Sequence, residues 1–228
     1  MKVASKLENV NQDIYATCMK AARNPNDIKI IAVTKYVSIE RAIEAIEAGI
    51  TNLGENRDEG ILEKWKVIGD RPTWHYIGSL QSRKVKNIID IVDYIHSLDR
   101  ISLAEEINKR AKKPVKCLVQ VNVSGENSKH GLSPNEVLSF IEKLKYFPNL
   151  IIEGLMTMAP NTDDENIIRH CFQSLKSLQT QVIEKRWEHA PCHELSMGMS
   201  NDFKIAIEEG ATMVRIGTAL VGEEEEVQ

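Results

Sequence analysis

The sequence lacks the features of a membrane, secreted or nucleic-acid-binding protein. None of its apolar runs is long enough to span a bilayer, and its N-terminus carries no apolar signal core. It has four cysteines among 228 residues, and no two of them form a CxxC pair. We therefore expect reduced thiols and a cytoplasmic protein. The 29 basic and 33 acidic residues give a net charge of −4, which argues against a general nucleic-acid surface.

The sequence does contain a regular alternation of strand-like and helix-like segments. An N-terminal helix with apolar residues from Leu7 to Ala21 comes first, and eight strands follow, each with a helix or final turn after it. This pattern predicts a closed, parallel (β/α)8 TIM barrel with the extra helix packed outside it. We expect residues 1–228 to form one such domain. The expected strands are residues 29–34, 50–54, 73–78, 92–97, 115–123, 151–158, 192–197 and 212–217.

An open, doubly wound sheet is the alternative architecture. Such a sheet usually carries a glycine-rich phosphate-binding turn after its first strand. Here the first strand leads into TKYVS, which contains no glycine. The sequence therefore favours the barrel.

A lysine stands at the end of the first apolar strand, where a barrel of this kind places its chemistry. The amine of Lys35 would become a nucleophile in apolar surroundings or beside another cation. The alternative is that Lys35 extends from the strand end into solvent and has no chemical role. The position of Lys35 alone does not distinguish these two interpretations.

The loops after strands seven and eight are expected to hold a phosphate. Ser200 fits the N-cap of the next helix, and Gly198 and Gly217 would let a phosphate approach the backbone. Ser200 could instead be only a cap, and Gly217 only a turn. A ligand with both an aldehyde and a phosphate would satisfy Lys35 and these loops together. Pyridoxal 5′-phosphate (PLP) is such a ligand, and Arg215 could face its pyridine nitrogen.

Several motifs extend this interpretation over nearly the whole chain. They are IIAVTKYVS, LGEN, WHYIGSLQSRK, HSLD, VQVNVSGENSKHG, GLMTMAP and SMGMSNDFKIAIEEGATMVRIGTA. Through them the chain resembles the YggS/PROSC family of pyridoxal phosphate homeostasis proteins. Members of that family in turn resemble the barrel domain of bacterial alanine racemases.

The resemblance implies a role for particular residues. Lys35 would hold PLP as a Schiff base, and Arg215 would face the pyridine nitrogen. Asn56 either hydrogen-bonds near the ring or forms a turn. No catalytic residue and no metal ligand is implied. The cofactor-binding residues so predicted are Lys35, Asn56, Ser200, Arg215, Gly217 and Thr218.

The chain departs from the family pattern at a few positions. Arg57 and the residues after it replace the usual aromatic and QE after GEN, and Arg83 replaces an asparagine. Val221 and Glu223 flank a glycine where the family usually has FG and a basic residue. These departures put rim or partner contacts in doubt rather than the cofactor site.

The resemblance also suggests a carrier or regulator of PLP rather than an enzyme. Alanine racemases use a second base, a tyrosine from a further domain, and this chain ends soon after its eighth strand. Tyr36 is expected to alternate away from Lys35 along the strand. An arginine at the pyridine nitrogen would leave that nitrogen unprotonated and weaken the ring as an electron sink. A weak racemase is the alternative, and a lysine aldolase comes third. We expect a monomer that interacts with PLP and, as partners, PLP-dependent apoenzymes.

Other residues have simpler interpretations. His189, Cys192 and His193 lie close together but lack the spacing of a metal site. His75 is expected to pack near the mouth of the barrel. Lys129 could neutralise a ligand anion or face solvent.

Overall fold

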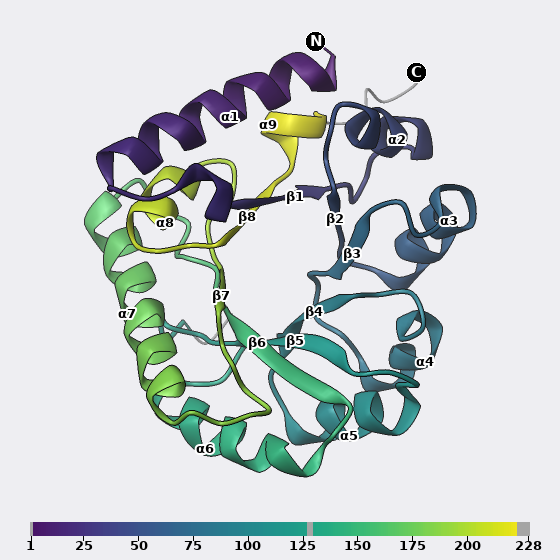
Figure 1. The fold of residues 1–228 in the computed structure, drawn as a ribbon, viewed down its shortest axis with the longest axis vertical. Helices are drawn as coiled ribbons and strands as arrows, with labels where there is room; N and C mark the ends of the chain where they lie inside the picture. The colour runs from purple at the N-terminus through teal and green to yellow at the C-terminus, as the bar shows by residue number, and fades with distance from the viewer. Residues whose placement is uncertain (1, 127–129, 223–228) are drawn as a thin grey trace.

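Eight parallel strands close into a barrel in chain order, from β1 beside β2 round to β8 beside β1 (Figure 1). The computed structural model describes residues 2–126 and 130–222. The predicted (β/α)8 barrel is confirmed. The strand ends lie within two residues of their expected positions, except that β5 ends three residues earlier than expected. The strands are β1 (Lys29–Val33), β2 (Asn52–Glu55), β3 (Thr73–Tyr76), β4 (Tyr94–Leu98), β5 (Val115–Gln120), β6 (Leu150–Met156), β7 (Glu194–Ser196) and β8 (Met213–Ile216).

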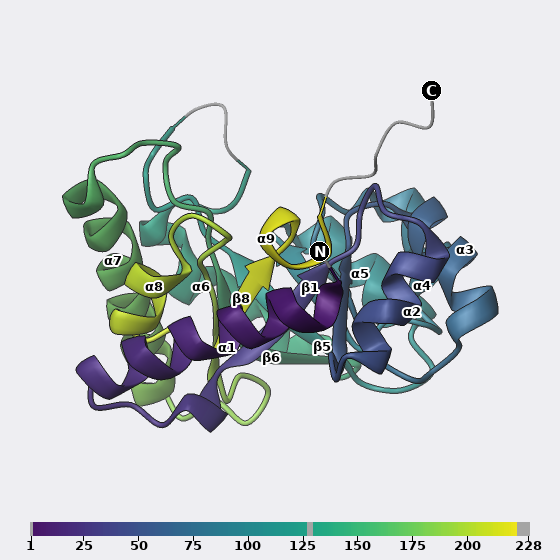
Figure 2. The ribbon, with the colours of Figure 1, turned by 90° about the horizontal axis from the view of Figure 1, so that it is seen from above.

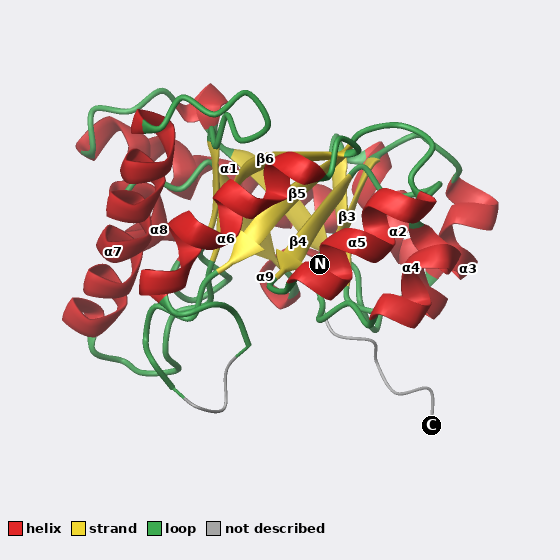
Figure 3. Ribbon diagram, turned by 90° about the horizontal axis from the view of Figure 1, so that it is seen from below, coloured by secondary structure: helices red, strands yellow, loops and turns green. Residues whose placement is uncertain are grey.

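Helices surround the barrel on all sides. Figure 3 shows the strands at the centre, between α6 to α8 on one side and α2 to α5 on the other. No helix in the described ranges has the length and apolar character to cross a bilayer. The helices are α1 (Val3–Lys20), α2 (Ile39–Glu47), α3 (Asp58–Ile68), α4 (Val85–Ile88), α5 (Ile101–Arg110), α6 (Val137–Lys143), α7 (Glu165–Glu184), α8 (Phe203–Glu208) and α9 (Thr218–Val221), with short 3₁₀ turns at Pro25–Asp27, Ser82–Lys84, Pro134–Glu136 and Leu144–Tyr146.

The extra N-terminal helix packs outside the barrel, as predicted. The buried face of α1 repeats every three or four residues, at Val3, Leu7, Val10 and Ile14. This face lies against α8, α9 and α2 (Figures 1 and 2). Helix α9 follows the last strand, where a final turn was expected. It lies between α1 and α2 and contacts β1 at the end of the barrel that carries Lys35.

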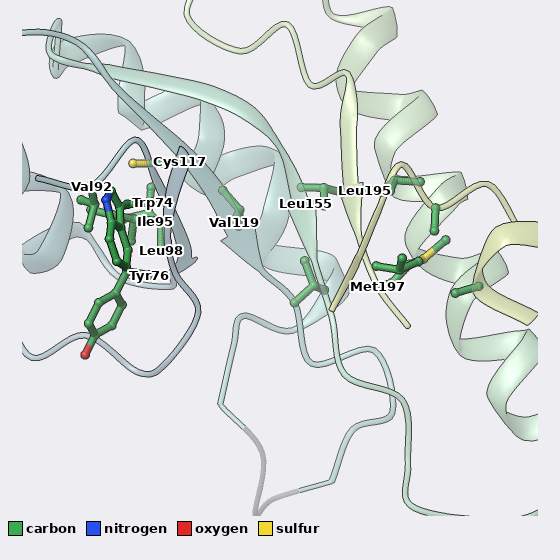
Figure 4. Packing of buried hydrophobic residues seen from close by; sticks show 14 of the residues in the cluster. Trp74, Tyr76, Val92, Ile95, Leu98, Cys117, Val119, Leu155, Leu195 and Met197 are labelled. Carbon is green, nitrogen blue, oxygen red and sulfur yellow. The ribbon is translucent and has the colours of Figure 1, made fainter. Parts of the chain in front are cut away.

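The strands separate an apolar outer face from an inner face of mixed character. Outward-pointing residues, such as Trp74, Val119, Leu155 and Leu195, pack against the helices in the main hydrophobic core (Figure 4). Burying one such side chain stabilises the fold by about 1.5–3 kcal/mol. A second, smaller cluster alternates with these residues on the inner side of the barrel. Its members are Ile31, Tyr94, Leu118, Met156 and Met213.

The inner face also holds charged and polar side chains that have little exposure to solvent. His75, His96, Ser196 and Arg215 are all at most 5% exposed. A buried polar group without a hydrogen-bond partner would cost several kcal/mol. The inside of this barrel must therefore supply hydrogen-bond partners for these side chains.

Candidate functional site

A cavity of about 350 Å³ opens where β1 and β8 end. Because β1 pairs with β8 in parallel, with Ala32 opposite Ile216, the residues that follow the two strands meet there. The structure thus brings Lys35, Gly217 and Thr218 together, as the sequence predicted. The residues that line the cavity are Val33, Lys35, Tyr36, Val37, Gly217, Thr218 and Gly222.

Lys35 lies in a turn rather than in the strand. Strand β1 stops at Val33, and the Val37 N–H donates to the Thr34 carbonyl across 3.2 Å to close the turn. Tyr36 takes a left-handed backbone conformation, with φ of 66°, which is rare for a bulky residue. Lys35 and Tyr36 are both exposed, and the Lys35 ammonium lies 5.3 Å from the Tyr36 ring centroid. The expectation that Tyr36 alternates away from Lys35 is therefore wrong, because the strand has already ended.

A buried ion pair fixes the residue before Lys35. The Thr34 hydroxyl donates to Glu55 Oε1 across 2.7 Å, and Lys64 Nζ lies 2.9 Å from the same oxygen. Glu55 and Lys64 are both buried, so removing either partner would leave a charge stranded in the core. Glu55 belongs to the LGEN motif, but no spacing along the sequence indicates this contact. Helix α3, which carries Lys64, thereby fixes the start of the Lys35 turn.

Ser200 does not cap the following helix, contrary to expectation. Helix α8 begins at Phe203 after Asp202, and the Asp202 carboxylate accepts a hydrogen bond from the Met199 N–H across 2.5 Å. The helix starts two residues later than predicted because this local hydrogen bond extends the turn. Ser200 instead lines a second cavity of about 530 Å³ between α1 and α8. Ala219 also lines that cavity, so the segment after Gly217 borders both.

The two glycines expected to admit a phosphate differ in the free space around them. Gly198 has φ of +91°, and a Cβ there would lie 2.5 Å from the Ala206 Cβ, so tight packing against α8 accounts for this glycine. At Gly217 an added Cβ would meet nothing nearer than Val33, at 3.6 Å. Packing against Val33 therefore does not demand a glycine at position 217, which leaves space for a ligand to approach the backbone.

Arg215 lies inside the barrel, deeper than the cavity. Its Nη1 donates to the Ser196 hydroxyl across 2.7 Å, and its Nη2 donates to the Thr157 carbonyl across 3.0 Å. Burial lowers the pKa of Arg215 to about 10, and the negative charge of Asp202 opposes that shift. Arg215 is therefore a cation at neutral pH.

Two buried histidines continue inward from Ser196. His96 Nδ1 lies 2.9 Å from the Ser196 hydroxyl, and His96 Nε2 lies 2.9 Å from His75 Nδ1. Burial lowers the pKa of His75 to about 3 and the pKa of His96 well below its usual range, where His75 and Arg215 lower it further. His75 lies in the barrel interior, stacked on Tyr94 with a centroid distance of 4.7 Å. His75 was expected near the mouth of the barrel, but it points into the interior from β3.

The cavity at Lys35 is not lined by Asn56, Arg57, Arg83 or Val221. Asn56 is partly buried after β2, and its backbone packs so closely on Gly78 that a Cβ there would lie 2.2 Å from the Asn56 carbonyl. Its role near a ring stays a prediction. Arg57 and Arg83 are exposed, and Val221 is buried in α9. Lys129 and Glu223 lie outside the described residues.

His189, in the segment after α7, has an ordinary structural contact. His189 Nε2 lies 2.9 Å from the Ile141 carbonyl oxygen. Within residues 2–126 and 130–222, no group of three or more histidine, cysteine or acidic side chains could hold a metal ion.

The chain is similar to known proteins both in sequence and in fold. The family model described as "Alanine racemase, N-terminal domain" matches residues 12–225. A "Pyridoxal phosphate homeostasis protein" of Aquifex aeolicus is 40% identical, over 98% of this chain and 99% of that protein. The structure of PipY from Synechococcus elongatus with PLP bound matches with a TM-score of 0.83 and 28% identity, over 96% of this chain and all of PipY. An alanine racemase of Clostridium difficile 630, with a TM-score of 0.79 and 17% identity, shares the fold over 99% of this chain and 58% of its own.

The buried histidines predict a pH dependence of folding. Both stay neutral in the folded protein, whereas in the unfolded chain they take up protons below about pH 6.5. The unfolded state then binds more protons, so the free energy of unfolding falls as the pH drops from 6.5 towards 3. The slope is at most about 1.4 kcal/mol per pH unit for each histidine.

Denaturant unfolding at pH 7, 6 and 5 would measure this effect. We expect His75→Gln to have a shallower pH dependence than the unsubstituted protein. His170→Gln, at an exposed histidine, should keep the original slope. Equal slopes for all three proteins would contradict the assignment of a neutral, buried His75.

Proposed function

The chain belongs to the alanine racemase N-terminal domain family and, within it, to the pyridoxal phosphate homeostasis proteins, and from this membership we propose that it binds PLP and acts as a carrier or regulator of PLP. The observation that carries this proposal is the meeting of Lys35, Gly217 and Thr218 in one cavity. An amine, a hydroxyl and an open stretch of backbone are the groups that an aldehyde-bearing phosphate ester needs.

The cavity suits such a ligand in size and chemistry. Its volume of about 350 Å³ falls in the usual range for small-molecule sites. Val33 and Val37 give it apolar walls, while the exposed Lys35 side chain supplies an amine. The free space at Gly217 lets a phosphate reach the backbone.

Each residue has a distinct role in this proposal. PLP supplies an aldehyde that bonds covalently to a lysine amine with loss of water, and a phosphate that anchors it. Lys35 provides the amine, held in place by the turn that Thr34 anchors. Gly217 and Thr218 bind the phosphate, with Ser200 on the far side of the same segment. Arg215 faces the ring nitrogen, and Asn56 lies at the rim.

A carrier role is supported over a racemase role by the arrangement of the acid–base groups. Racemisation needs two such groups on opposite faces of the substrate, each contributing about 10²–10⁴-fold. Lys35 and Tyr36 instead lie side by side in one turn, with Lys35 Nζ 5.3 Å from the Tyr36 ring centroid. Arg215 is a permanent cation, so it leaves an adjacent ring nitrogen unprotonated and does not strengthen the ring as an electron sink.

The cell compartment and the partners are further parts of the proposal. Cys18, Cys117 and Cys192 are buried free thiols, which suits the reducing cytoplasm. The cavity is open at the rim, where Lys35 and Tyr36 are exposed. An open site would let a monomer release PLP to PLP-dependent apoenzymes.

The first test concerns Lys35. Borohydride reduction of the PLP-loaded protein should fix the label on the peptide that contains Lys35. Lys35→Ala should lose the label without loss of stability, because the side chain is exposed. Lys204→Ala, at another half-exposed lysine, should keep it. Peptide mapping by mass spectrometry checks the result, and a label on a different lysine would refute the assignment.

The second test concerns the phosphate. We expect pyridoxal, which lacks the phosphate, to bind more weakly than PLP. Thr218→Ala should weaken PLP binding about ten-fold, the loss expected for one hydrogen bond to a charged group, and should leave pyridoxal binding nearly unchanged. Gly217→Ala adds a methyl group at an ordinary distance from Val33, and it should lower PLP affinity by occupying the cavity.

Calorimetric titration of both vitamers against these variants and Ser200→Ala would measure the contributions separately. A smaller effect for Ser200→Ala than for Thr218→Ala is expected, because Ser200 lines the neighbouring cavity. Equal affinities of the unsubstituted protein for PLP and pyridoxal would rule out a phosphate site.

The third test separates carrier from racemase. The PLP-loaded protein is incubated with L-alanine in deuterated water, and both α-deuteration and D-alanine are followed. We expect exchange far slower than the ordinary enzyme range of about 1–10³ per second, with Tyr36→Phe showing the same rate. Turnover within that range, abolished by Lys35→Ala, would promote the racemase alternative.

A further inference from the structure

A continuous row of hydrogen-bonded side chains crosses the interior of the barrel. It starts at Arg215 on β8 and passes through Ser196 on β7 and His96 on β4 to His75 on β3. It ends at Asn52, at the start of β2, whose Oδ1 lies 3.0 Å from His75 Nε2. Every separation along the row is 2.7–3.0 Å, within normal hydrogen-bond range.

The chemistry of the two ends gives the row one direction. A guanidinium can only donate, so the Ser196 oxygen accepts from Arg215 and its hydroxyl hydrogen is available for His96 Nδ1. His96 then carries its proton on Nε2 and donates it to His75 Nδ1. His75 likewise carries its proton on Nε2 and donates to Asn52 Oδ1.

The opposite direction fits the contacts less well. His96 would then donate from Nδ1 to the Ser196 oxygen, which already accepts from Arg215. The Ser196 oxygen would then accept from both Arg215 and His96, and its own hydroxyl hydrogen would need a further acceptor. At the far end, the Asn52 amide nitrogen already donates to the Thr51 hydroxyl across 3.0 Å, which leaves its oxygen to accept from His75.

We propose that Ser196, His96 and His75 are positioning residues, which hold the Arg215 guanidinium in one orientation and so fix the N–H groups that remain for the ring nitrogen of a bound ligand. This inference rests on the proposed function for its ligand, although the row itself exists without one. The Thr157 carbonyl fixes a second point of the guanidinium, so the group cannot rotate about either contact alone.

Neutral partners have an electrostatic consequence that a carboxylate would not have. Arg215 donates to the Ser196 hydroxyl and to the Thr157 carbonyl, which are both uncharged. Asp202 is the acidic group that acts on its charge. The full positive charge therefore remains directed at the ligand. Tyr94 stacks on His75. The positive charge of Lys29 disfavours protonation of His75, and that of Arg215 disfavours protonation of His96.

The direction of the row can be tested without any ligand. Nitrogen-15 NMR of the two imidazole rings in the free protein should show the proton on Nε2 and none on Nδ1 for both His75 and His96. Ser196→Ala should shift the His96 Nδ1 signal, since it removes the hydroxyl donor. A proton on His96 Nδ1 would overturn the direction, and this outcome does not depend on whether the protein binds PLP.

The positioning role is tested by comparing PLP with an analogue whose ring nitrogen is replaced by CH. The unsubstituted protein should bind PLP more tightly than the analogue. Ser196→Ala should reduce this ratio of affinities about ten-fold and shift the absorption maximum of the bound chromophore. His75→Gln, farther along the row, should cause a smaller loss in the same sense, and it keeps the test available if Ser196→Ala does not fold.

Ser97→Ala is the matched control, because the Ser97 hydroxyl is equally buried on β4 but has no hydrogen-bond partner in the described structure. It should leave both the preference and the spectrum unchanged. An equal loss of affinity for PLP and for the analogue in Ser196→Ala would mean a general structural effect and would overturn the proposal. Failure of every protein to bind PLP would instead refute the proposed function and leave the NMR result standing.

Discussion

The pairing of β1 with β8 closes the barrel, and the candidate site depends on that closure. The two strands come from opposite ends of the chain, yet their parallel register sets Ala32 opposite Ile216. The residues that follow each strand must therefore leave the barrel at the same edge. An amine from the first strand and a glycine–threonine pair after the last one meet only for this reason. Helices α1 and α9 pack together beside this junction and hold it closed.

The closed barrel also creates the conditions for its buried charge. An inner face shared by eight strands excludes water, so Arg215 is kept there by hydrogen bonds rather than by hydration. Burial in turn keeps His75 and His96 neutral, because a charged imidazole would lose its hydration there, and the charge of Arg215 further disfavours a cation at His96. Neutral histidines can both donate and accept, and this property lets them form a directed row.

The sequence was sufficient for features that depend on local pattern and on chain order. The strand positions, the outer N-terminal helix and the meeting of Lys35 with Gly217 follow from periodicity and from the barrel rule. Two errors arose at turns, where a single hydrogen bond or left-handed residue moves the boundary: the cap assigned to Ser200 and the alternation assigned to Tyr36. The row inside the barrel was missed because its members come from five strands, and no spacing along the chain relates them.

The turn that carries Lys35 combines a fixed backbone with an exposed side chain. Thr34 is held by the buried Glu55–Lys64 pair, and its carbonyl closes the turn onto Val37. The Lys35 amine itself extends from that fixed point into an open cavity. Racemisation needs acid–base groups held on both faces of the substrate. The single anchored amine beside the open backbone at Gly217, with the Arg215 cation deeper in the barrel, supports the proposed carrier role over the racemase alternative.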